Sequence, residues 1–334
     1  NLIKLARQKM NDLTTYTDIL AAARTLNGHS VPTPLINNKL LDDLIGAQVL
    51  IKCENLQMTG SFKFRGAFNK ISHLLNNSAN KLFVAWSSGN HAQAVAAASA
   101  MSDAKASIVM PRDAPQIKIE GTKYFGAEII FYDRNTEVRE DIGTQLANET
   151  GAQIVPPYDD EQVIAGQGTV GLEAAAQMLA LDVSPDIALV PCGGGGLIAG
   201  CAIALRQHFP NIIIHPVEPK GFDDTGRSLT LGKRVSNRPG ESSLCDSLLA
   251  PTPGAVTFKI NSQLLGSGKV VSDEDIQFAL MFAMKQLKMV TEPGGVAALA
   301  DLLCNKEAYK GKKVLVILSG GNVDQAILEQ AINN

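Results

Sequence analysis

Short runs of apolar residues alternate with longer stretches of helical periodicity along most of this chain. Seven apolar runs predict strands: Gln48 to Cys53, Leu82 to Ala85, Ala106 to Met110, Glu128 to Tyr132, Ile187 to Pro191, Ile212 to Val217 and Lys313 to Leu318. Alanine-rich or amphipathic stretches between them predict helices: Ala92 to Met101, Gly168 to Leu181 and Asp273 to Met289. Continuous apolar strands that alternate with helices are typical of mostly parallel sheets covered on both faces. The pattern therefore predicts an α/β fold whose ligands bind at the carboxyl ends of strands.

Composition and charge narrow the class of protein. The 334 residues suffice for two lobes, and 29 glycines fit a fold rich in strand-to-helix turns. A net charge of −3 argues against nucleic acid or an anionic membrane as a partner. No run reaches the roughly 18 apolar residues of a membrane span. The first residues, Asn1 to Arg7, do not resemble a signal peptide. The five cysteines show no CxxC pair and no metal-ligand spacing, which favours reduced thiols in the cytoplasm.

The segment from Gly221 to Lys259 is the least regular part of the chain. It carries Gly, Pro, Ser and Asp without a clear period. We expect it to wrap the surface near the site rather than to form a separate linker.

Lys63 is the first candidate for chemistry, because it lies between Phe62 and Phe64 after a turn of small residues. Apolar neighbours disfavour the ammonium form, which leaves the amine nucleophilic and able to form a Schiff base. A lysine that merely extends its amine to the surface is the alternative.

Four consecutive glycines, Gly193 to Gly196, follow a predicted strand and open a helix. Such a loop lets main-chain N–H groups converge on an anion, and a phosphate is the natural guest. Gly194, Gly196 and Ala199 also match G-x-G-x-x-A, and Glu218 stands where a ribose-binding acid would lie, so a nicotinamide dehydrogenase is a competing hypothesis. A dinucleotide fold, however, usually carries this turn on its first strand, and it would leave Lys63 unexplained.

Two further polar segments follow strands. Ser87, Ser88, Gly89, Asn90 and His91 stand at the start of the alanine-rich helix, where unpaired N–H groups suit a carboxylate. An ordinary helix cap is the alternative. Ser319 to Asn322 closes the last strand and by itself indicates only a turn.

Together these segments resemble pyridoxal-phosphate enzymes of the tryptophan synthase β fold, specifically the serine/threonine dehydratase and serine racemase family. The resemblance rests on Gly60 to Ala67, Ser87 to His91, Gly193 to Gly196 and Ser319 to Asn322, and it extends to Pro156 to Asp159 and Ala165 to Thr169. It covers nearly the whole chain. Cysteine synthases would be expected to show a Thr-Ser-Gly-Asn-Thr loop, which is absent here.

The resemblance implies how the cofactor is held. Lys63 would bind the cofactor aldehyde as a Schiff base, and Phe62 would pack against the pyridine ring. Asn90 would bond the phenolic oxygen, and Ser319 would meet the ring nitrogen. The phosphate would be held by Gly193, Gly194, Gly195 and Gly196. A neutral hydroxyl at the ring nitrogen gives a weaker electron sink, which suits β-elimination.

The resemblance also implies the reaction. Ser87, Ser88, Asn90 and His91 would seat the α-carboxylate, while Lys63 removes the α-proton as general base. The expected reaction is α,β-elimination from L-threonine or L-serine to a 2-oxo acid and ammonia.

Two alternatives stay open within the same chemistry. Ser88 matches the serine that lets some members racemise serine, so it is the second candidate catalytic residue. Elimination from 3-hydroxyaspartate would need a cation near the second carboxylate, and Arg134 and Arg139 are candidates.

Glu218 gains a different explanation from the resemblance. Together with the Phe222 carbonyl and Asp224 it resembles the divalent-cation site of the serine racemase branch, which binds Mg²⁺, Ca²⁺ or Mn²⁺. Oxygen ligands of this kind suit Mg²⁺. An exposed acidic loop is the alternative.

The chain departs from the family at one loop, where Ser247 replaces a glycine of the common Ala-Asp-Gly sequence. We expect a large cofactor-binding lobe of residues 1–76 and 162–334, a small inserted lobe of residues 77–161, and a homodimer. The chain ends soon after Ser319, so we expect no C-terminal regulatory domain.

Overall fold

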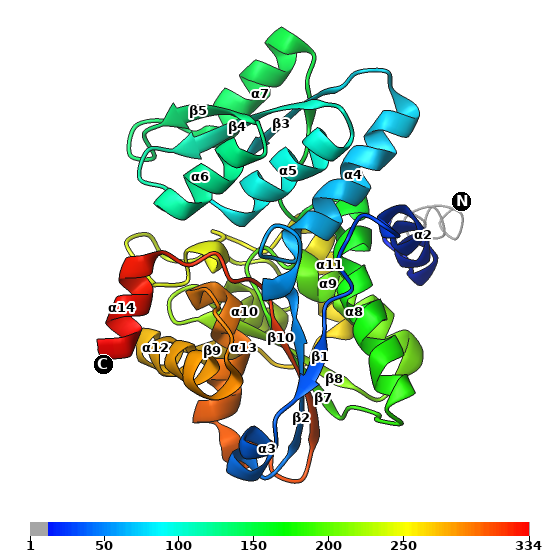
Figure 1. Cartoon of the computed structure of the whole chain (residues 1–334), viewed down its shortest axis with the longest axis vertical. Helices are drawn as coiled ribbons and strands as arrows, with labels where there is room; N and C mark the ends of the chain where they lie inside the picture. The colour runs from blue at the N-terminus through cyan, green and yellow to red at the C-terminus, as the bar shows by residue number, and fades with distance from the viewer. Residues whose placement is uncertain (1–12, 334) are drawn as a thin grey trace.

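The computed structural model describes residues 13–333 and contains two sheets, which form the cores of an upper and a lower lobe (Figure 1). The larger sheet has the strand order β1-β2-β10-β7-β8-β9 and the smaller one β5-β4-β3-β6. The strands of the larger sheet are β1 (Leu35–Asn37), β2 (Gln48–Cys53), β7 (Ile187–Pro191), β8 (Ile213–Pro219), β9 (Lys269–Val271) and β10 (Lys313–Leu318). The strands of the smaller sheet are β3 (Leu82–Trp86), β4 (Lys105–Pro111), β5 (Glu128–Tyr132) and β6 (Gln153–Ile154).

Helices cover both sheets. In the described part of the chain they are α2 (Tyr16–Leu26), α3 (Lys39–Ile45), α4 (Lys63–Asn77), α5 (Asn90–Met101), α6 (Gln116–Tyr124), α7 (Arg139–Thr150), α8 (Glu161–Ala180), α9 (Gly196–His208), α10 (Asp224–Leu231), α11 (Ala255–Leu264), α12 (Asp273–Phe282), α13 (Pro293–Cys304) and α14 (Gln325–Asn333). Figure 1 shows α4 to α7 with the small sheet, and α8, α9 and α13 with the large one.

The predicted α/β fold is confirmed. All strand pairs are parallel except β1 with β2, which is antiparallel. Each of the seven predicted strands is present, three of them with small shifts at their ends. The sequence did not predict β1, β6 and β9, which are only two or three residues long.

Two predictions of local structure were wrong in part. The segment from Gly221 to Lys259 is not irregular throughout, because it contains α10 and the first half of α11. The helix expected from Asp273 to Met289 ends at Phe282, and a short π-helix, Ala283–Leu287, follows it. The division of the lobes after residues 76 and 161 stays a prediction, and residues 1–12 lie outside the described part of the chain.

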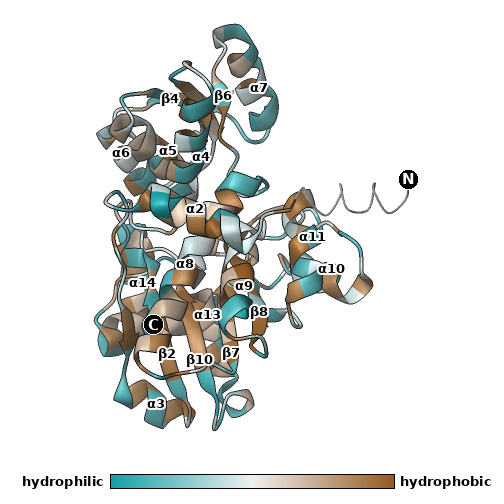
Figure 2. Ribbon diagram, turned by 90° about the vertical axis from the view of Figure 1, so that its right-hand side faces the viewer, coloured by the Kyte–Doolittle hydropathy of each residue, from teal (hydrophilic) through white to brown (hydrophobic). Residues whose placement is uncertain are grey.

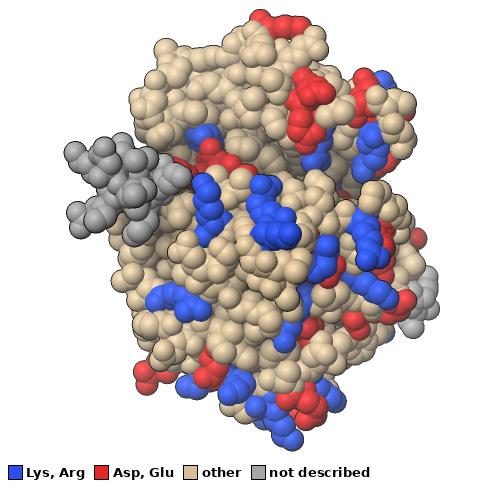
Figure 3. All heavy atoms as spheres, turned by 180° about the vertical axis from the view of Figure 1, so that it is seen from behind, with Lys and Arg blue, Asp and Glu red and all other residues tan. Residues whose placement is uncertain are grey.

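The large sheet is buried on both faces, as continuous apolar strands require. Val49 and Ile51 pack on one side with α13, whereas Leu50 packs on the other side with α8 and α9. The hydropathy colouring shows the same apolar strands enclosed by helices (Figure 2). On the face seen in Figure 3, acidic and basic side chains are interspersed. Within residues 13–333, no helix is both long and apolar enough to span a membrane.

Buried charges fix the start of α4. Arg65 donates from Nε and Nη2 to the two carboxylate oxygens of Glu54, each at 2.8 Å, and its Nη1 lies 2.9 Å from Glu173 on α8. Lys52 on β2 donates to Glu173 as well, at 2.8 Å. Two cations therefore face two anions, and the network ties β2, α4 and α8 together beneath Lys63.

Candidate active site

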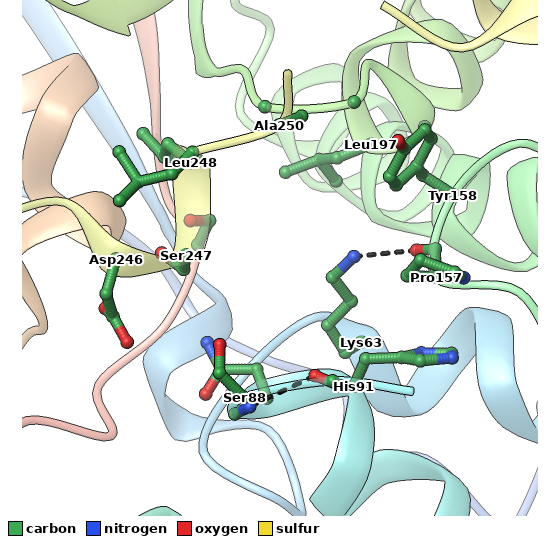
Figure 4. Close-up of a pocket in the computed structure, with 18 of the residues that line it drawn as sticks. Lys63, Ser88, His91, Pro157, Tyr158, Leu197, Asp246, Ser247, Leu248 and Ala250 are labelled. Carbon is green, nitrogen blue, oxygen red and sulfur yellow. Dashed lines mark hydrogen bonds between the residues drawn. The ribbon is translucent and has the colours of Figure 1, made fainter. Parts of the chain in front are cut away.

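The carboxyl ends of β3, β7 and β10 meet at a cavity that residues of both lobes line. Every residue predicted to hold the cofactor or the substrate contributes to this lining: Phe62, Lys63, Ser87, Ser88, Asn90, His91, Gly193, Gly194, Gly195, Gly196 and Ser319. The roles given to them remain predictions, but their convergence is a finding of the structure. Figure 4 shows Lys63 extending into this cavity, with Ser88 below it and Leu248 across from it.

Lys63 is the first residue of α4, and its amine is buried. The Nζ atom donates to the Pro157 carbonyl at 2.7 Å and lies 5.2 Å from the centre of the Phe62 ring (Figure 4). Burial lowers the pKa of Lys63 to about 8, although the negative charge of Glu292 opposes that shift. A substantial fraction of the amine is therefore unprotonated and nucleophilic near neutral pH.

Pairing between two loops brings Ser319 next to Lys63. Phe62 donates its N–H to the Ser319 carbonyl at 3.1 Å, and Gly321 donates to the Gly60 carbonyl at 2.8 Å. Ser61 forms an antiparallel bridge with Gly320 between these bonds. The segment from Ser319 to Asn322, which the sequence identified only as a turn, thus supports the loop that carries Lys63.

The glycine loop turns its carbonyls toward α11. Gly194 accepts from the Thr257 hydroxyl at 2.7 Å, and the Gly195 carbonyl lies 3.3 Å from Nδ2 of Asn261. The first N–H groups of α9, which begins at Gly196, have no intrahelical partner. At Gly194 a Cβ would come within 2.4 Å of the Tyr158 ring, so a side chain would collide there. The loop suits an anion because it exposes main-chain donors without side chains in the way.

The serine loop places His91 and Asn90 at the start of α5. Nε2 of His91 donates to the Val155 carbonyl at 2.8 Å, while Nδ1 is buried with no hydrogen-bond partner among the described residues. Burial and the charge of Lys63 lower the pKa of His91 to about 3, so the ring is neutral. Its side chain therefore offers a lone pair rather than a donor, and main-chain N–H groups at this helix start are the better seat for a carboxylate.

The structure adds charged residues that the motifs did not predict. Lys118 on α6 lines the cavity and is buried, with Nζ 2.7 Å from Asp246 and 3.0 Å from Glu292. These partners belong to the large lobe, so Lys118 links the two lobes. The sequence around Lys118 carries no signal for this role, whereas Glu292 lies in a segment that resembles the family.

Arg139 and Arg134 have different places. Arg139, at the start of α7, lines the cavity, and its Nε pairs with Glu140 at 2.8 Å. Arg134 is about half exposed and pairs with Asp113. Only Arg139 of these two candidates can reach a substrate in the cavity.

Ser247 fits because its neighbour lacks a side chain. A Cβ at Gly294 would lie 2.1 Å from the Ser247 hydroxyl oxygen, so this hydroxyl occupies the space above Gly294. The departure from the family glycine is therefore accommodated by a glycine on α13.

Glu218 and Asp224, two of the expected metal ligands, are buried near each other. Glu218 accepts from the N–H groups of Thr225 and Gly226, each at 2.8 Å, while Asp224 accepts from Asn237. Burial and the neighbouring Asp224 raise the pKa of Glu218 to about 8, and burial raises that of Asp224 to about 6. Across residues 13–333, no group of three His, Cys, Asp or Glu side chains could hold a metal ion.

The residues present fit pyridoxal phosphate. A buried amine with a lowered pKa can bind its aldehyde, and a side-chain-free loop at a helix start can bind its phosphate. Ser319 and Asn90 both line this cavity, so a hydroxyl and an amide are present for the polar atoms of the cofactor ring.

Comparison with known proteins agrees with this geometry. Residues 26–320 match the family described as pyridoxal-phosphate dependent enzyme. L-threo-3-hydroxyaspartate ammonia-lyase of a Pseudomonas species is 41% identical over 93% of this chain and 96% of its own length. L-threonine ammonia-lyase of Thermotoga maritima is 38% identical over 96% of this chain and 78% of its own length.

A solved structure shows the same fold. Maize serine racemase has a TM-score of 0.89 and 36% identity, and the alignment covers 96% of this chain and 97% of that one. The nicotinamide dehydrogenase hypothesis is thereby set aside. The chain belongs to the pyridoxal-phosphate-dependent enzymes, within the group of ammonia-lyases and serine racemases.

Proposed function

We propose that this enzyme removes ammonia from a β-hydroxy amino acid, with L-threonine and L-serine as substrates. The observation that carries the proposal is the buried Lys63 amine beside the glycine loop and Ser319 in one cavity. Pyridoxal phosphate, when bound, supplies an electron sink for the electron pair left at Cα. Ser319, a neutral hydroxyl, would meet its ring nitrogen, and the four glycines would hold its phosphate.

Lys63 has the chemistry of the general base. It would hold the cofactor aldehyde and, as a free amine, would take the proton from Cα of the substrate, since a pKa of about 8 lies close to the working pH. The Pro157 carbonyl, 2.7 Å from Nζ, keeps the amine on this side of the cavity. The β-hydroxyl would leave with a proton as water, and the released enamine would tautomerise to an imine that water hydrolyses to a 2-oxo acid and ammonia.

The substrate carboxylate would lie at the start of α5. Ser87, Ser88 and the N–H groups of Asn90 and His91 provide donors there. Ser87 already accepts from the N–H of Gly89 at 3.0 Å, so its hydroxyl hydrogen is available to a ligand.

A second substrate, 3-hydroxyaspartate, is favoured by Arg139. Its guanidinium is the cation that the second carboxylate needs, and it lines the same cavity as Lys63. The Pseudomonas relative is named for this substrate.

Racemisation of serine is favoured by Ser88, which lines the cavity together with Lys63 (Figure 4). A hydroxyl on the opposite side of Cα from the lysine could return the proton with inverted configuration. The maize structural relative is a serine racemase.

One panel of substrates separates these activities. The holoenzyme is incubated with L-serine, D-serine, L-threonine and both 3-hydroxyaspartate diastereomers, and oxo acid and enantiomer are measured. Lys63→Ala should abolish oxo acid formation. Arg139→Met should lower kcat/KM for 3-hydroxyaspartate by about a hundredfold and change serine and threonine much less, since a charge-assisted pair is lost. Arg134→Met is the matched control. No oxo acid from any substrate would refute the elimination.

We further propose that Glu218, the Phe222 carbonyl and Asp224 bind Mg²⁺, or Ca²⁺ or Mn²⁺ in its place. Oδ2 of Asp224 is buried with no hydrogen-bond partner among the described residues, and two buried carboxylates repel each other unless a cation or proton lies between them. After chelator treatment, added Mg²⁺ should raise the Tm of the wild type but not that of Glu218→Gln. Asp223→Asn, next to the proposed site, should behave like the wild type; an equal response of Glu218→Gln would refute the site.

The family also supports a homodimer, and the buried thiols of Cys53, Cys192, Cys201 and Cys245 support a reducing, cytoplasmic setting. Sedimentation at micromolar concentration tests the first of these proposals. A monomer would contradict it.

A further inference from the structure

Asn322 ends the Ser319–Asn322 segment but is not among the described residues that line the cavity. Its side chain is nevertheless fixed. Nδ2 donates to the Thr59 carbonyl at 2.8 Å and to Oδ1 of Asn90 at 2.9 Å. Its Oδ1 lies over Gly60, where an added Cβ would be only 2.4 Å away. The amide thus lies flat on the turn that leads into Lys63.

The donors and acceptors in these hydrogen bonds are fixed by the groups at the two ends of the chain of bonds. The Thr59 carbonyl can only accept, so the NH2 group of Asn322 must face it. The same NH2 group reaches Asn90, which must therefore turn its carbonyl oxygen toward Asn322. At the other end Nδ2 of Asn90 donates to the Glu292 carboxylate, whose second oxygen is 3.0 Å from Lys118. The orientation of the Asn90 amide is set from both sides.

This orientation decides what Asn90 offers to the cavity. Its oxygen faces Asn322 and one N–H donates to Glu292, so the donor that remains for the cavity is the second N–H. An N–H stabilises an ionised phenolic oxygen on the cofactor, whereas a carbonyl oxygen in its place would stabilise the protonated phenol. When the phenolic oxygen is ionised, the proton lies on the Schiff-base nitrogen instead.

We propose that Asn322 is a positioning residue that holds the Asn90 amide with its N–H toward the cofactor's phenolic oxygen. It thereby keeps the proton on the Schiff-base nitrogen at Lys63. The inference rests on the proposed contact between Asn90 and that oxygen. Asn90 would supply the N–H donor, and Asn322, more than 200 positions away in the sequence, would set its direction.

The test is a spectroscopic titration of the holoenzyme. The form with a protonated Schiff-base nitrogen absorbs in the visible, and the other forms absorb at shorter wavelength. Asn322→Leu keeps the shape but removes the donor to Asn90 without adding charge. At a pH well below the midpoint of the visible band, we expect the ratio of the visible band to the shorter-wavelength band to fall by about tenfold, because the bond to the ionised oxygen weakens and the proton moves to that oxygen. Asn322→Ala should lower this band ratio as well, and it decides the question if the leucine variant does not fold.

Asn69→Leu is the matched control. Asn69 is a buried amide on α4 whose Nδ2 donates to the Gln162 carbonyl at 2.8 Å, outside the cavity lining, so its loss should leave the band ratio unchanged. A band ratio at the wild-type value, or above it, in the folded Asn322 variants would overturn the inference. A wild type without a visible band, or a band that survives in Lys63→Ala, would overturn the proposed cofactor anchor instead.

Discussion

At the scale of single residues, Lys63 shows how its surroundings change the chemistry of a side chain. Burial lowers its pKa from 10.5 to about 8, which raises the amine fraction at pH 7 by roughly 300-fold. In the sequence, the flanking phenylalanines indicated that the amine would be desolvated. The Pro157 carbonyl and Glu292, which also act on the amine, lie 94 and 229 positions away and could not be inferred from that segment.

The lowered pKa of Lys63 predicts how fast the enzyme without cofactor takes up pyridoxal phosphate. Only the unprotonated amine attacks the aldehyde, so the rate should rise about tenfold per pH unit below pH 8 and level off above it. Stopped-flow absorbance between pH 6.5 and 9.5 measures this rate. A rate that still climbs tenfold per unit at pH 9.5 would mean that the amine is not desolvated.

At the scale of elements, the start of α4 is held by a buried charge network rather than by a side-chain cap. Glu54 is completely buried; burial opposes its ionisation, but Arg65 and Thr33 outweigh that effect and hold its pKa below the usual value. Tight packing adds to this anchor, since a Cβ at Gly166 on α8 would lie 2.5 Å from the Arg65 carbonyl. The position of Lys63 therefore depends on how three elements meet.

Replacing Arg65 should expose the strength of this network. Arg65→Met leaves Glu54 buried without its cation, which should cost about 3–5 kcal/mol of unfolding free energy. The double variant Arg65→Met/Glu54→Gln should recover part of that loss, because no unpaired charge remains. Urea unfolding of Arg65→Met, of Glu54→Gln and of the double variant measures the coupling energy between the two residues. Strictly additive losses would show that the pair does not act as a unit.

At the scale of the whole molecule, Lys118 connects the lobes. It extends from α6 of the small lobe to Asp246 and Glu292 of the large one, and these charges raise its pKa although burial opposes that shift. The same carboxylate of Glu292 also holds Asn90. The arrangement of the lobes and the polar wall of the site are thus linked through one lysine.

Removing this link should loosen the contact between the lobes. In Lys118→Met the two carboxylates lose their shared cation, so we expect at least tenfold weaker binding of pyridoxal phosphate and faster proteolysis between the lobes. Lys123→Met, which removes an exposed charge from the same helix, is the control. Fluorescence titration and limited proteolysis measure the two effects, and wild-type behaviour of Lys118→Met would show that the ion pairs do not hold the lobes together.

The sequence by itself determined the α/β class, the long strands and the residues whose chemistry is local. Apolar runs indicate buried parallel strands. The chemistry of the glycine loop and of a lysine between aromatic residues is indicated by the residues next to them in the sequence. Short strands such as β1 and β6 were missed because two or three residues show no period.

Only the tertiary structure decided which distant groups meet. Lys118 with Glu292, Asn322 with Asn90, and Ser247 with Gly294 are pairs whose members are 47 to 232 positions apart. Nothing in either partner's neighbourhood specifies the other, since such contacts depend on strand order and on how the helices pack around the site.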